Sequence, residues 1–142
     1  MTIIGFKFTT VEGKREKDAI KGEVKVSSTP TITEVKEADL QQIDKKALSL
    51  RFEFITAYEP DIGVIKVGGE VFYIGDNSAN VLKQWKTKKM LPEEVGVEIL
   101  NYLFRRCLLK ISAIAEDLQL PPPIGFPRVK PKEPATQTAY VG

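Results

Sequence analysis

The sequence predicts an α+β fold, in which an antiparallel sheet of about four strands is followed by a short and a long helix packed on one face. Two observations support this. In the first half of the chain, apolar residues alternate with polar ones, which is the period of a half-buried strand. From residue 90 onward, apolar residues instead recur every three or four positions, the period of one helical face.

The first strand is predicted from the alternation of Ile4, Phe6 and Phe8 with Gly5 and Lys7. Residues 10–22 follow, and they are polar, charged and without any apolar period. We expect this stretch to be a mobile loop.

A second strand is expected within residues 23–36, where Val24 and Val26 are followed by Ile32 and Val35. Pro30 interrupts this stretch and has no backbone N–H for a ladder hydrogen bond. It therefore limits this stretch to an edge strand, a bulge or a break. Residues 38–45 are polar and are predicted to connect this strand to the next.

The clearest strand is residues 48–54, in which four large apolar side chains alternate with Ser49, Arg51 and Glu53. Residues 58–61 read as a turn, because Pro60 presets one backbone angle. The chain returns as a strand over residues 62–74, which contain the glycine pair at 68–69. The pair allows a two-residue hairpin or a kink in one long strand, and the kink is favoured because the preceding turn already supplies a hairpin.

Two helices should complete the domain. Asn77 or Ser78 can cap a short helix that ends near Lys88. A long helix is predicted from Pro92 to about Leu118, since proline is tolerated in a first helical turn. Its apolar face has the three-four spacing of Leu100, Leu103, Phe104, Cys107, Leu108, Ile111, Ile114, Ala115 and Leu118.

The long helix leads into residues 120–128, Leu-Pro-Pro-Pro-Ile-Gly-Phe-Pro-Arg, here called the proline-rich segment. Its prolines hold the chain extended, so Ile124 and Phe126 have little entropy left to lose on binding. Both side chains either bind a partner or anchor the segment to the sheet. We expect one domain over residues 1–128 and a disordered, proline- and lysine-containing tail over residues 129–142.

Composition argues against an enzyme and against a metal or cofactor site. The 142 residues include no histidine and one cysteine, Cys107, which lies on the predicted apolar helix face. The usual general base and the commonest metal ligand are therefore missing.

The N-terminus shows no signal peptide and no apolar stretch is long enough to cross a bilayer, so we expect a cytoplasmic protein. A net charge of +2 makes nucleic acid an unlikely partner.

The long helix also predicts self-association. A helix of about 26 residues spans roughly 39 Å, more than one small sheet is expected to cover. We therefore expect a homo-oligomer, a dimer or a tetramer, with another subunit covering part of the apolar face. The expected interface residues are Leu100, Phe104, Cys107, Leu108 and Ile111.

The order of these elements resembles the SecB preprotein-export chaperone family. The resemblance rests on two adjacent strands (ALSLRFEFITAY and IGVIKVGGEVFYIGD) joined by a tight acidic turn. It also rests on a helix with arginines in its apolar stripe (ILNYLFRRCLLKISAIAEDL) that ends in LPPPIGFPRV. The family differs in being markedly acidic, in having a second helix after this segment, and in its motor-binding tail.

The resemblance implies a small antiparallel sheet, a tetramer, a role in protein transport, and ATP-independent binding of unfolded polypeptides in apolar grooves. We expect the polypeptide-binding residues to be Tyr58, Trp85, Leu120, Ile124 and Phe126. A structural or regulatory subunit with one folded partner is the second hypothesis. A nucleic-acid-binding module is the third, suggested by the basic residues around Trp85.

Overall fold

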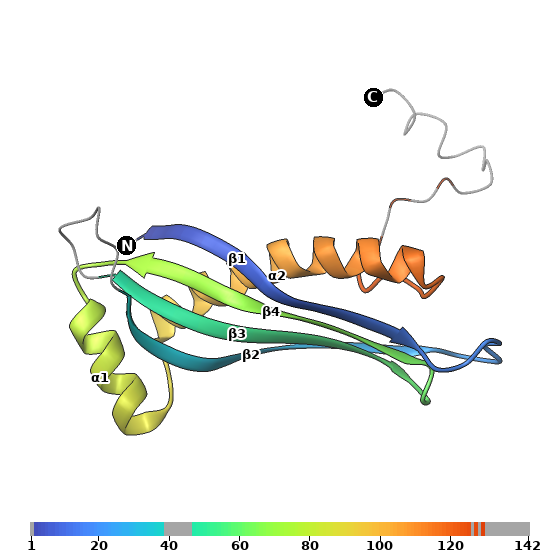
Figure 1. The fold of residues 1–142 in the computed structure, drawn as a ribbon, viewed down its shortest axis with the longest axis horizontal. Coiled ribbons are helices and arrows are strands. Elements are labelled where there is room, and N and C mark those ends of the chain that lie inside the picture. Colours follow the sequence, from blue (N-terminus) through green and yellow to red (C-terminus); the bar gives the residue numbers. More distant parts are fainter. Residues whose placement is uncertain (1, 39–46, 126, 128, 130–142) are drawn as a thin grey trace, which may run out of the picture.

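The computed structural model describes residues 2–38, 47–125, 127 and 129 (Figure 1). The described part contains four strands followed by two helices, as the sequence predicts. The strands are β1 (Thr2–Arg15), β2 (Lys25–Ala38), β3 (Ala47–Glu59) and β4 (Gly63–Ile74), and the helices are α1 (Ser78–Lys88) and α2 (Glu93–Asp117). The predicted polar connection at residues 38–45 lies almost wholly outside the described residues, and so does the predicted tail from residue 130 onward.

The four strands form one antiparallel sheet with the order β1-β4-β3-β2. Helix α2 runs along the length of this sheet, while α1 lies at the end of the molecule where α2 begins (Figure 1). The α+β fold class is therefore confirmed. In the described part of the chain, β1 and β2 are the two edge strands.

The prediction of a mobile loop from residue 10 was wrong, because β1 continues to Arg15. Its second half pairs with β4 residue by residue, from Thr10 opposite Gly68 to Arg15 opposite Gly63. Ladder hydrogen bonds join backbone groups, so a polar edge strand with one face in water needs no apolar alternation. Pairing with the long strand β4 therefore keeps residues 10–15 in β1, although their own side chains show no strand pattern.

The expectation for Pro30 is confirmed, because β2 is an edge strand that pairs only with β3. Pro30 lies opposite Phe54 within a continuous ladder. The register shift in this strand comes later, between Ile32 and Glu34, so the proline itself does not break the pairing.

The two central strands also agree with the sequence. Between them the chain turns at a cis Glu59–Pro60 peptide bond, and Asp61 has a φ of 50°. β4 runs unbroken through Gly68 and Gly69, so the glycine pair is not a hairpin. Gly69 is required for space, because a Cβ atom there would collide with the backbone carbonyl of Lys7 on β1.

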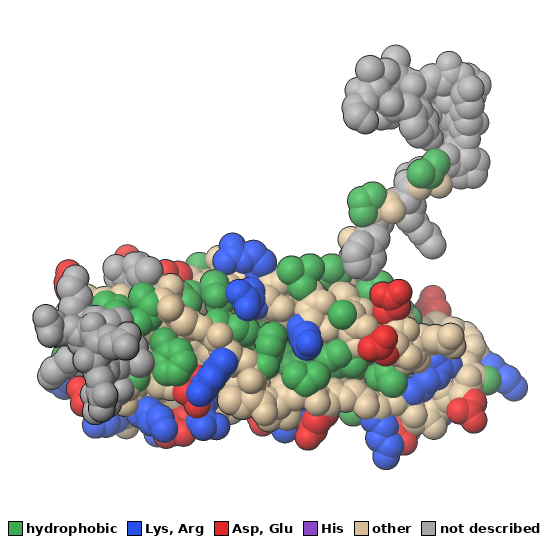
Figure 2. Space-filling model, turned by 45° about the horizontal axis from the view of Figure 1, so that its top comes forward, with side chains coloured by type: hydrophobic (Ala, Val, Ile, Leu, Met, Phe, Trp, Pro, Cys, Tyr) green, Lys and Arg blue, Asp and Glu red, His purple; other side chains and the backbone are tan. Residues whose placement is uncertain are grey.

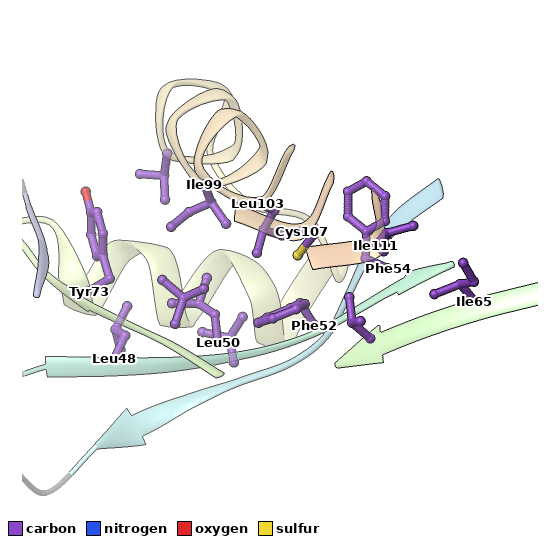
Figure 3. Packing of buried hydrophobic residues seen from close by; sticks show 14 of the residues in the cluster. Leu48, Leu50, Phe52, Phe54, Ile65, Tyr73, Ile99, Leu103, Cys107 and Ile111 are labelled. Atoms are coloured by element: carbon purple, nitrogen blue, oxygen red, sulfur yellow. The ribbon is translucent and has the colours of Figure 1, made fainter. Parts of the chain in front are cut away.

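One face of the sheet and one line of α2 form the core. Leu48, Leu50, Phe52 and Phe54 of β3 point toward α2, and all four are buried (Figure 3). Alternate residues of the same strand, such as Arg51 and Glu53, are on the other face. The fully buried line of α2 repeats every four residues and consists of Val95, Ile99, Leu103, Cys107, Ile111 and Ala115.

The sheet face away from α2 is crossed by ion pairs between neighbouring strands. Arg51 donates to the nearly buried Glu70 at 3.1 Å, and Ser49 donates to the same carboxylate at 3.0 Å. Lys66 and Glu53 form a second cross-strand pair at 3.1 Å. These partners neutralise each other, so this face has no uniform charge.

Candidate functional site

The flank of α2 that lies beside its buried line remains partly open to solvent. Leu100, Phe104 and Leu108 form this flank, here called the outer ledge, and Phe104 is 38% exposed. The Phe104 ring touches the buried Phe54 edge-on, with 5.5 Å between ring centroids. The outer ledge is thus fixed to the core on one side and open to solvent on the other.

A groove with a volume of about 520 Å³ lies at the C-terminal end of α2. Leu109, one of its apolar residues, has 62% of its surface accessible. Helix α2 supplies one wall and the start of the proline-rich segment supplies the other. The lining residues are Leu109, Ser112, Ala113, Glu116, Gln119, Leu120 and Pro122.

The start of the proline-rich segment is held firmly against the sheet. The Tyr58 hydroxyl at the end of β3 donates a 2.7 Å hydrogen bond to the Pro121 carbonyl. The Leu120 side chain is buried, and its amide donates to the Ala115 carbonyl at 2.9 Å. Burial raises the pKa of Tyr58 to about 12, so its hydroxyl remains a proton donor at neutral pH.

Beyond this anchor the segment leaves the body of the domain. Pro122 is exposed and Ile124 is half-buried. Phe126, the other side chain predicted to bind a partner, lies outside the described residues. Within the part that can be followed, the segment is anchored at residues 120–121 and displays Ile124 beyond them.

Two of the predicted polypeptide-binding residues, Tyr58 and Leu120, lie close together, and Ile124 follows them along the proline-rich segment, but Trp85 is not among them. Tyr58, Leu120 and Ile124 all belong to the end of the molecule where α2 stops. Trp85 lies on α1 at the opposite end (Figure 1), is only 9% exposed and has the Lys89 ammonium 5.7 Å from its ring. It packs inward as a core residue.

The predicted interface residues divide in the same way. Cys107 and Ile111 are 0% exposed and belong to the core of the chain itself, so they have no surface left for another subunit (Figure 3). Leu100, Phe104 and Leu108 form the outer ledge and do keep accessible surface. Figure 2 shows how hydrophobic side chains run along one long face of the molecule between lysine and arginine side chains.

The chemistry available at these surfaces is packing and hydrogen bonding. Burial raises the pKa of the Cys107 thiol to about 12, so it is neither ionised nor accessible as a nucleophile at neutral pH. No group of three His, Cys, Asp or Glu residues is arranged to hold a metal ion in the described part of the chain. No helix in that part is both long and apolar enough to span a membrane.

Sequence reasoning missed Leu109 and Ala113, which are two of the apolar residues that line the groove. Both lie on the outward side of α2, where Asn101 and Arg105 set a polar pattern. The available signal was the break in that pattern, because a leucine with no neighbour to cover it is unexpected on a solvated helix face.

No family model matches the chain, and no curated protein matches it in sequence. A solved structure is similar in fold, namely the SecB-like chaperone Rv1957 of Mycobacterium tuberculosis in complex with a ChAD peptide from the HigA1 antitoxin. The similarity covers 91% of this chain and 89% of that one, with a TM-score of 0.60 and 13% sequence identity. The chain therefore has a SecB-like fold, although identity this low does not show membership of the family.

Proposed function

We propose that this chain is an ATP-independent chaperone, a holdase, which binds extended apolar segments of unfolded polypeptides. The observation that carries the proposal is the groove beside Leu109, which is walled by the proline-rich segment on a fold shared with a peptide-binding chaperone. A second hollow of about 490 Å³ lies beside Tyr58 and Val64, but three of its seven lining residues are acidic, namely Glu16, Glu59 and Asp61, which makes it less suited to an apolar segment.

The groove suits an extended segment for two physical reasons. Its helical wall extends over two turns of α2, from Leu109 to Glu116, and its apolar residues stand beside polar residues such as Ser112 and Gln119. Its second wall is stiffened by three consecutive prolines, so little conformational entropy is lost when a client binds. The proline-rich segment would then place Ile124 on the far side of the client.

The test is suppression of aggregation of several unrelated unfolded proteins, with Leu109→Asn compared to the unmodified chain. Leu109 is exposed, so its replacement should leave the fold intact while removing apolar surface from the groove. Met90→Asn is the matched control, because Met90 is 63% exposed but lies between α1 and α2, at the end of the molecule opposite the groove. Activity that survives Leu109→Asn, or falls equally in the control, would contradict this site.

A second candidate function is a subunit dedicated to one partner. The specific observation in its favour is that the peptide bound to the similar chaperone comes from one named antitoxin. Clients distinguish the two functions: a holdase protects unrelated unfolded proteins at similar concentrations, whereas a dedicated subunit protects a single partner and fails with the others.

We further propose that the outer ledge is where two copies of the chain meet. Leu100, Phe104 and Leu108 are apolar, follow each other at one-turn spacing, and remain open in the isolated chain. An isologous contact would bury each ledge against the same ledge of a second copy. The groove beside Leu109 is adjacent to this contact but on a different side of α2, so both surfaces can be used together.

A further inference from the structure

The end of α2 is electrostatically unfavourable when it is considered alone. Its last turn contains Glu116 and Asp117 and no basic residue. The C-terminus of a helix carries partial negative charge on carbonyls that lack intrahelical partners, and it is stabilised by cations and opposed by carboxylates. A cation brought to this point from elsewhere in the fold would therefore stabilise the helix end.

Arg15, the last residue of β1, supplies that cation from more than a hundred residues away. Its Nη1 donates to the Leu118 carbonyl at 3.0 Å and to the Gln119 carbonyl at 2.7 Å. Gln119 has a φ of 54°, so it makes the left-handed turn at which the chain leaves the helix. Arg15 thus binds the backbone carbonyls immediately before and after the Cα atom of Gln119, the residue at which the chain changes direction.

The same guanidinium also holds the loop that follows β1. Its Nε donates to the Lys17 carbonyl at 2.7 Å and its Nη2 donates to the Asp18 carbonyl at 2.9 Å. Four backbone carbonyls from two distant segments therefore share one side chain. A planar guanidinium can make such a set of contacts, whereas a lysine ammonium has three donors and no fixed fork.

We propose that Arg15 is a positioning residue that sets the direction of the proline-rich segment and so keeps the groove beside Leu109 open. This rests on the proposed function. Tyr58 holds Pro121 just beyond, so Arg15 and Tyr58 together fix the chain from residue 118 to residue 121. Without Arg15 the turn at Gln119 loses its clamp, and the segment samples directions in which the groove has only one wall.

The position of the segment can be measured directly with a spin label. Gly125 is exposed and a Cβ atom there meets nothing within 4 Å, so Gly125→Cys adds a labelling site without a clash. Cys107 is fully buried with a raised pKa, so a nitroxide reagent at neutral pH labels position 125 alone. The mobility of the nitroxide then reports how tightly the segment is held.

Arg15→Ala and Arg15→Lys are compared in this background with Lys14→Ala, the matched control. Lys14 is the neighbouring cation, and within the described residues its side chain forms an exposed ion pair with Glu16. We expect the label to be more mobile in both Arg15 variants and unchanged in the control. If the segment is then correctly placed only about a third to a tenth of the time, the Kd for an unfolded client rises about three- to tenfold.

The outcomes separate the two proposals. Unchanged label mobility in a folded Arg15 variant overturns the role of Arg15. Raised mobility with unchanged client affinity upholds that role but contradicts the groove as the binding site. Arg15→Lys retains the charge at the strand end, so it serves as the decisive variant if Arg15→Ala does not fold.

Discussion

The hydrogen bond from Tyr58 to Pro121 makes a quantitative prediction for Tyr58→Phe. This substitution removes one hydroxyl and leaves the buried ring in place, so it creates no large cavity. The bond is short, at 2.7 Å, and its loss leaves the Pro121 carbonyl half-buried without this donor. We expect the free energy of unfolding at pH 7 to fall by about 1 kcal/mol, the usual net contribution of such a bond.

The pKa of Tyr58 predicts how the difference in unfolding free energy between Tyr58→Phe and the unmodified chain depends on pH. Tyr58 has its pKa raised from 10.0 to about 12 in the folded chain. The protonated Tyr58 hydroxyl therefore makes its full contribution to the free energy of unfolding below pH 10, and this contribution is lost as the pH rises toward 12. Above pH 10 the unmodified chain loses about 1.4 kcal/mol of unfolding free energy per pH unit through this group, and Tyr58→Phe does not. The two proteins should have nearly equal stability near pH 11.

Denaturant unfolding at pH 7, 9 and 11 measures both effects. Tyr102→Phe is the matched control, because Tyr102 is half-buried in an aromatic contact with Phe6 and should lose almost nothing. Equal stability of Tyr58→Phe and the unmodified chain at pH 7 would show that the bond contributes nothing. A deficit that stays constant up to pH 11 would refute the raised pKa.

Three further predictions follow from buried and exposed positions. Gly69→Ala should destabilise the fold by several kcal/mol in thermal or denaturant unfolding, because its Cβ would collide with the Lys7 carbonyl, whereas Gly125→Ala should be neutral. Cys107 should resist thiol reagents at pH 8 in the folded chain and react fully once denaturant is added. A rapid reaction under native conditions would mean that α2 detaches from the sheet. Light scattering should give a mass above 15.9 kDa at micromolar concentration, and Phe104→Ser should lower it. A single-chain mass for the unmodified protein would contradict the outer ledge as a contact.

The sequence predicted those parts of the fold whose local pattern matches their burial. β3 alternates because only one of its faces packs against α2, and α2 shows its helical period for the same reason. β1 was predicted too short, because its second half depends on pairing with β4 and on nothing visible in its own side chains. Periodicity reports burial, and it says little about a polar edge strand.

The site was predicted less completely, because it depends on which elements meet. The proline-rich segment was identifiable from its composition, and Tyr58 was correctly placed beside it. Trp85 is buried on α1 at the other end of the molecule, a placement that nothing in the sequence shows. The contacts of Arg15 with residues 118 and 119 join positions too far apart in sequence for any local pattern to reveal.

The most direct test of the central claim is site-specific photo-crosslinking to an unfolded client. A photo-reactive amino acid is placed at Leu109 in the groove or, as the control, at Met90, which lies between α1 and α2 at the other end of the molecule. Both positions are exposed, so the reactive group can reach a bound chain from either one. The proposed function predicts client adducts from position 109 that are absent at position 90 and are displaced by excess unlabelled client. Equal crosslinking from the two positions, or crosslinking from position 90 alone, would contradict it.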